Sequence, residues 1–153
     1  MRSISYGEVT FQGMYKLICD YMLKSKGQEF KITVGTDSQN YDITKVVVVV
    51  AIWNVGHGGI FFYDIKKVNK ITNVRQKIFY ETSLSIELAD KLLKKFNENN
   101  LNYEISIHVD AGDNGESGKL ISEIVSWVNS CGFTCMTKPD SYAASSIANK
   151  YSK

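Results

Sequence analysis

The sequence predicts an α/β fold with a mixed five-stranded sheet, helices on both faces of that sheet and an extra helix at the N-terminus. Two observations carry this prediction. The run KVVVVVAIW, residues 45–53, is rich in β-branched residues and does not alternate, as expected for a strand that is covered on both faces. The predicted elements follow the order helix, three strands, helix, strand, helix, strand, helix, which is typical of an α/β domain.

The first half of the chain predicts one helix and three strands. Apolar residues recur at helical spacing over 9–25, and Gly27 follows as a helix stop. Strands are predicted over 30–37, 45–54 and 59–65, and the glycine-rich turn NVGHGG between the last two is typical of a hairpin. The short connections predict that these three strands pair antiparallel.

The second half of the chain alternates between helices and strands. The period becomes helical over 73–97, and the alternating run YEISIHVD predicts a fourth strand over 103–110. A glycine-rich loop leads to a helix predicted over 119–130, GFTCMTK predicts a fifth strand over 132–138, and a last helix is predicted over 142–151. Because helices separate these later strands, we expect them to be parallel and joined by right-handed crossovers.

The composition is that of one soluble globular domain. With 153 residues, 44% of them hydrophobic and 22% charged, the chain can bury a core, and we expect a single domain over residues 1–153. No apolar run approaches the roughly 20 residues that span a bilayer. The start, MRSISYGEVTFQG, lacks the apolar segment of a secretory signal, so we expect a cytoplasmic protein without a membrane partner. The net charge of +2 neither requires nor excludes nucleic acid.

The three cysteines are too few for a disulfide framework. Cys131 and Cys135 are four residues apart, but the chain offers no second Cys/His pair to complete a zinc site. We therefore expect both thiols to be buried and to act as small hydrophobic side chains.

Two aspartates lie at the ends of predicted strands. Asp37 ends the first strand, within GTDSQ, and Asp110 ends the fourth, where it shares a face with His108. If these strands are parallel neighbours, both carboxylates emerge at the same carboxyl edge, where ligand sites of α/β sheets collect. The alternative for Asp37 is a plain turn. His108 is more typical of a core histidine than of a general base.

Glu81 falls within the apolar stripe of the helix predicted over 73–97, between Ile78 and Ser85. A carboxylate on a buried face is costly unless a cation or hydrogen-bond donors meet it, which favours a functional site. The alternative is a helix that begins near Tyr80, which would make Glu81 a first-turn acid stabilised by the helix dipole.

Asp140 follows the fifth predicted strand and precedes the last helix, so it is either a further site acid or only a helix cap. Carboxylates that converge raise each other's pKa values unless a cation neutralises them. Such hard oxygen ligands suit Mg²⁺ or Mn²⁺. Two of these ions can activate a water and stabilise a leaving oxygen in phosphodiester hydrolysis.

Four stretches, GTDSQ, YETSL, HVDAGDNGESGKLI and KPDSYAASSIA, resemble the YkuK-type family of ribonuclease H-like proteins. They run from Gly35 to Ala148 and are specific when taken together. The resemblance implies a ribonuclease H-like fold. It also suggests the catalytic, metal-binding acids, which would be Asp37, Glu81, Asp110 and Asp140.

Residues near the predicted acids are candidate substrate contacts. The loop AGDNGESGKL resembles a phosphate-binding loop, but its glycines are one residue too far apart and Leu120 replaces the metal-binding Ser or Thr. We therefore do not expect a nucleoside triphosphatase. Lys119 could still contact a substrate phosphate, and the alternative is a surface loop without a role. The other candidate contacts, each with a turn or a cap as its alternative role, are Ser38, Gln39 and Ser141.

These observations predict a metal-dependent nuclease that hydrolyses phosphodiester bonds in RNA, DNA or a hybrid, by a two-metal-ion mechanism. The alternative is a non-catalytic module of the same fold that binds nucleic acid or a protein, because folds do not dictate function. This alternative draws support from the absence of an evident basic surface in the sequence.

Overall fold

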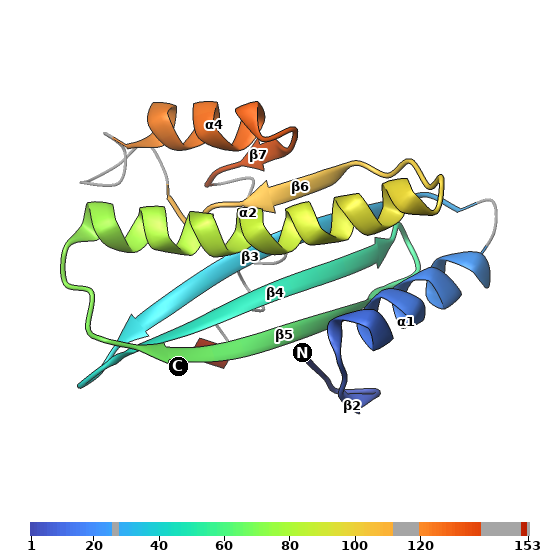
Figure 1. The fold of residues 1–153 in the computed structure, drawn as a ribbon, viewed down its shortest axis with the longest axis horizontal. Helices are drawn as coiled ribbons and strands as arrows, with labels where there is room; N and C mark the ends of the chain where they lie inside the picture. The colour runs from blue at the N-terminus through green and yellow to red at the C-terminus, as the bar shows by residue number, and fades with distance from the viewer. Residues whose placement is uncertain (26–27, 112–119, 139–150, 153) are drawn as a thin grey trace.

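The computed structural model describes residues 1–25, 28–111, 120–138 and 151–152. This part of the chain forms a mixed seven-stranded sheet in the order β2-β1-β5-β4-β3-β6-β7 (Figure 1). The five predicted strands are present, and two short strands, β1 (Arg2–Ser3) and β2 (Gly7–Glu8), extend one edge. The predicted count of five is therefore wrong, because a two-residue strand carries no alternation that the sequence could reveal.

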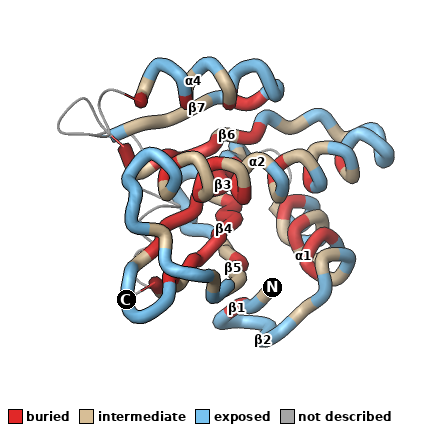
Figure 2. The backbone as a smooth tube through the Cα atoms, turned by 60° about the vertical axis from the view of Figure 1, so that its left-hand side comes forward, coloured by how far each residue is buried: buried red, intermediate tan, exposed pale blue. Residues whose placement is uncertain are grey.

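Three long antiparallel strands form the centre of the sheet: β3 (Phe30–Asn40), β4 (Thr44–Asn54) and β5 (Gly59–Val68). Figure 2 shows that β3 and β4 are buried along most of their length, as the β-branched run predicts. β3 does not end at Asp37, as predicted, because its last three residues pair with β4 up to the hairpin turn. Pairing with a neighbour outweighs the turn-forming tendency of these polar residues.

The two remaining strands are parallel to their neighbours, which confirms the prediction for the second half of the chain. β6 (Ile105–His108) pairs with β3, and β7 (Thr134–Met136) pairs with β6. Both are shorter than predicted. Asp110 therefore lies two residues beyond β6 instead of within it.

Three helices are described: α1 (Phe11–Leu23), α2 (Val74–Glu98) and α4 (Ile121–Ser130). α2 begins where predicted, because the side chain of Asn73 caps it by accepting a hydrogen bond from the backbone N–H of Gln76. Glu81 thus lies well inside the helix, and the alternative of a start near Tyr80 is wrong.

All three helices pack with one face of the sheet in a single apolar core, to which Ile32, Val34, Ile18, Leu92 and Ile124 contribute. On the opposite face, Val47 and Val49 are covered by Tyr151, whose ring stacks on Tyr63 with 4.2 Å between centroids. The predicted last helix lies almost entirely outside the described residues. The sequence predicts helices on both faces of the sheet. The structure shows them on one face, and the prediction for the opposite face falls mostly on residues that the structure does not describe.

Cys131 does not follow its prediction. α4 continues to Ser130, so Cys131 lies at the helix end and is exposed, while Cys135 on β7 is half-buried. In the part of the chain that is described, no helix combines the length and the apolar character needed to cross a membrane.

Candidate active site

The strand register places Asp37 and Asp110 next to each other. Gly35 of β3 pairs with His108 of the parallel strand β6, and two residues further along each strand are the two aspartates. Neighbouring strands lie about 4.8 Å apart, so these carboxylates emerge together where the pairing of β3 with β6 ends. This is the juxtaposition that the sequence predicts.

The same two-residue step adds a residue that the sequence analysis missed, Lys138. His108 pairs with Met136 of β7, and two residues further along these two chains Lys138 lies next to Asp110. Its ammonium lies 2.7 Å from Oδ1 of Asp110, and the hydrogen bond to that carboxylate, together with its charge, raises the pKa of Lys138. The two predicted strands, 103–110 and 132–138, both ended on a charged residue, and that signal could have revealed the pair.

Glu81 reaches β3 from the helix above it. The hydroxyl of Ser38 donates to Oε2 of Glu81 over 2.5 Å, and the hydroxyls of Thr36 and Ser85 are 2.7 Å apart. Four helical residues rise about 6 Å and two strand residues about 6.7 Å, so both pairs fit at once when α2 runs antiparallel to β3. These two buried contacts fix the height of Glu81 above the strand.

The side chain of Asp37 lies on the other face of β3. Alternate residues of a strand face opposite sides, so Asp37 points away from α2 while Ser38 points toward it. On that opposite side, the hydroxyl of Ser152 donates to Oδ2 of Asp37 over 3.1 Å. The carboxylates of Asp37 and Glu81 therefore flank the strand rather than facing each other across open space.

The electrostatics show that negative charge here is poorly compensated. Glu81 is only 8% exposed, and burial, together with Asp37 and Asp110, raises its pKa to about 8 against the opposing effects of Ser38 and Lys77. Burial and Asp110 likewise raise the pKa of Asp37. A bound cation would favour the charged forms of these groups.

The donor chemistry fits a hard divalent cation, but each carboxylate is held by its own donor: Asp110 by Lys138, Asp37 by Ser152 and Glu81 by Ser38. Within the described ranges, no three Asp, Glu, His or Cys side chains are arranged so that they could hold a metal ion. The remaining predicted site residues, Asp140, Lys119 and Ser141, lie outside the described residues.

Ser38, Gln39 and His108, which the sequence analysis also singled out, differ in burial and in role. Ser38 is 2% exposed and orients Glu81, so it is a positioning residue rather than a surface contact. Gln39 is half-buried and pairs with Lys45 of β4. His108 is buried, and burial lowers its pKa, which favours the neutral imidazole of a core histidine.

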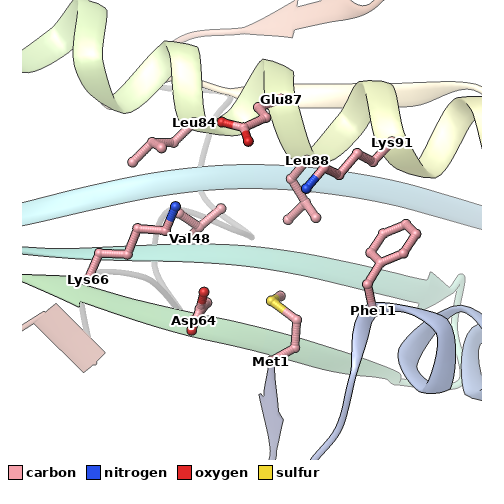
Figure 3. Close-up of a pocket in the computed structure, with 9 residues that line it drawn as sticks. All are labelled: Met1, Phe11, Val48, Asp64, Lys66, Leu84, Glu87, Leu88 and Lys91. Carbon is pink, nitrogen blue, oxygen red and sulfur yellow. The ribbon is translucent and has the colours of Figure 1, made fainter.

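A cleft of about 240 Å³ lies beside α2, away from these acids (Figure 3). Leu84 and Leu88 of α2 face Val48 across it, and charged side chains of β5 and α2 surround it. None of Asp37, Glu81 and Asp110 lines this cleft. The candidate site is thus a cluster of charged side chains where the pairing of β3 with β6 ends, and this cleft is not part of it.

A family model described as ribonuclease H-like matches residues 13–153. The chain belongs to the ribonuclease H-like family. This ribonuclease H-like chain is also similar to the "Uncharacterized protein YkuK" of Bacillus subtilis (strain 168), with 29% identity over 164 positions that cover 99% of the chain and 95% of the relative. The resemblance stated from the sequence is confirmed. No solved structure gives a significant match.

Proposed function

We propose that this ribonuclease H-like chain is a nuclease that hydrolyses nucleic-acid phosphodiester bonds with two divalent metal ions, Mg²⁺ or Mn²⁺. Asp37, Glu81 and Asp110 hold the ions, and Asp140 completes the set. The observation that carries the proposal is the buried carboxylate of Glu81, whose pKa is raised to about 8 beside two further acids. A buried carboxylate is costly unless a cation or hydrogen-bond donors compensate its charge, and the hydroxyl of Ser38 compensates that of Glu81 only in part.

The chain's own residues prepare this site. Ser38 orients the carboxylate of Glu81, and the Thr36–Ser85 contact fixes the helix that carries it. Lys138 contacts an oxygen of Asp110, two residues beyond β6, so a metal ion would have to compete with Lys138 for that oxygen. When bound, the metal ions would supply an activated water and stabilise the charge on the leaving oxygen.

A second candidate function is a non-catalytic module that binds nucleic acid or a protein. The ion pair between Lys138 and Asp110 favours it, because a resident cation already neutralises one of the three acids. In such a module the acids would be a structural network of an inherited fold.

Thermal unfolding with and without Mn²⁺ or Mg²⁺ separates these functions. A ligand at 100 times its Kd stabilises the folded state by about 2.7 kcal/mol, which corresponds to a Tm increase of about 5–10 °C for a chain of this size. The nuclease proposal expects this increase in the wild type, its loss in Asp37→Asn and Asp110→Asn, and its retention in Asp90→Asn, which changes a surface acid of α2. Equal behaviour of all four proteins would contradict it.

A further inference from the structure

One side of α2 forms a wall of the cleft of about 240 Å³ that lies beside this helix. Leu84, Glu87, Leu88 and Lys91 are spaced i, i+3, i+4 and i+7, so they project from the same side of the helix. All four side chains line the cleft (Figure 3). This wall therefore combines two apolar side chains with one acid and one lysine.

The opposite wall of the cleft comes from β4 and β5. Val48 of β4 pairs with Asp64 of β5, and Lys66 follows two residues further along the same strand. These three side chains lie on one face of the sheet, and all of them line the cleft. Met1 and Phe11 line one end of it (Figure 3). Each wall thus supplies one acid and one lysine around an apolar floor.

The acid and the lysine of the α2 wall do not pair with each other. Asp90 and Lys94 of the same helix form an ion pair at 2.9 Å, with the i,i+4 spacing and the acid-first order that favour such pairs. Glu87 and Lys91 have the same spacing and order, but no ion pair joins them. Instead, Lys91 extends over the cleft toward Lys66 of the other wall (Figure 3).

The charges around the cleft favour a ligand that carries both signs. Asp64 and Lys66 also form no ion pair with any residue that the structure describes. Because two lysines and two carboxylates line the cleft, a simple anion or cation is attracted and repelled to a similar extent. The volume of about 240 Å³ is below the roughly 300–1,000 Å³ of pockets that enclose drug-sized ligands, so the cleft suits a smaller molecule.

We propose that this cleft binds a small zwitterion with an apolar side chain, which is the chemistry of a hydrophobic amino acid. The carboxylate of the ligand lies between the ammonium groups of Lys66 and Lys91. Its ammonium faces the carboxylates of Asp64 and Glu87, and its side chain packs on Val48 and the two leucines of α2. This binding is separate from the candidate active site and does not rest on the proposed nuclease.

NMR of the ¹⁵N-labelled protein, titrated with L-leucine in chelator, measures this binding. We expect saturable shifts of the amide signals of β5 and α2 beside the cleft, with a Kd of about 1 mM for a ligand this small. Two analogues, 4-methylpentanoate and 3-methylbutylamine, each lack one charged group of leucine, and glycine lacks its side chain. Each of these three compounds should bind about fivefold more weakly, or less tightly still.

Variants of the two lysines show whether binding occurs in this cleft. Lys66→Gln and Lys91→Gln should each weaken leucine binding about fivefold. The matched control is Lys67→Gln, which removes the same charge from the next position on the opposite face of β5 and should bind like the wild type. Thermal unfolding confirms that each variant is folded.

Three results would overturn the proposal. They are the absence of saturable shifts at about ten times the expected Kd, tighter binding of a single-charge analogue than of leucine, and an equal loss of binding in Lys67→Gln. A nucleoside monophosphate that shifts the same amides where leucine does not would also overturn it, because the cleft would then take an anion. The metal-dependent Tm increase tests the nuclease proposal separately, so the two proposals can fail independently.

Discussion

The ammonium of Lys138 lies 2.7 Å from a carboxylate oxygen of Asp110, at the ends of two neighbouring parallel strands. This ion pair places a cation of the chain on an acid that the proposed function assigns to a metal. Lys138 and a metal ion would then compete for the same oxygen. The strength of the proposed metal binding would therefore depend on a residue outside the predicted set of acids.

Lys138→Gln should increase the affinity for Mn²⁺. The side chain of Lys138 is 58% exposed, so its ion pair contributes at most about 1 kcal/mol, and the metal concentration at half-maximal Tm increase should fall about two- to fivefold. Thermal unfolding over a Mn²⁺ titration measures this. Lys94→Gln is the matched control, since it removes a surface ion pair with Asp90 on α2. A higher metal requirement in Lys138→Gln would show that Lys138 supports the metal site instead of competing with it.

Glu81→Gln should stabilise the protein at pH 8 in chelator. The pKa of Glu81 is raised from 4.5 to about 8, so the folded state binds this proton more tightly than the unfolded chain does. Stability that is present below about pH 4.5 is therefore lost as the pH rises to 8. The neutral amide avoids that loss, and we expect a gain of about 1–2 kcal/mol, or about 3–6 °C in Tm.

Thermal unfolding of Glu81→Gln and wild type at pH 5 and pH 8 tests the sign. The advantage of the variant should be larger at pH 8 than at pH 5. A variant that is less stable than the wild type at pH 8 would mean that Glu81 is already well compensated in the folded protein.

The contact between Thr36 and Ser85 should be worth about 1 kcal/mol to the folded state. Both hydroxyls are buried and lie 2.7 Å apart, so removing one leaves the other without this partner. Thr36→Val and Ser85→Ala should each lower the free energy of unfolding by about 1–2 kcal/mol, and the double variant by less than their sum. Urea unfolding of the three variants gives the coupling. Strict additivity would show that the contact does not hold α2 on β3.

The three cysteines should differ in reactivity. Cys131 is exposed, whereas burial raises the pKa of Cys135 to about 11 and also raises that of Cys19. Because the thiolate is the reactive form, a disulfide reagent at pH 8 should modify one thiol rapidly in the folded protein and all three after denaturation. Cys131→Ser should abolish the fast phase. A fast phase that survives this change would contradict the described end of α4.

The long elements of the fold could be predicted from the sequence, and the shortest ones could not. The long strands and α2 carry strong periodic signals, whereas β1 and β2 are held only by pairing with strands distant in sequence. Asp37 was predicted at a strand end because Ser38, Gln39 and Asn40 are turn-forming residues. Their pairing with β4 extends the strand beyond it.

The candidate site was predictable where a single residue conflicted with its local pattern. Glu81 stood out as a carboxylate on an apolar stripe, and Asp37 and Asp110 followed from parallel strands. Lys138 was missed because its significance depends on the strand register, which sets its neighbours and which the sequence does not state. The aromatic stack of Tyr151 on Tyr63 depends on the same kind of long-range placement.

The proposed nuclease activity is measured by cleavage of a labelled panel of single-stranded RNA, single-stranded DNA, hybrid and branched junction, with Mn²⁺, Mg²⁺ or chelator. We expect cleavage by the wild type that requires metal and is lost in a folded Asp110→Asn protein. Equal behaviour of wild type and Asp110→Asn on every substrate would contradict it, and Asp110 would then be only the ion-pair partner of Lys138.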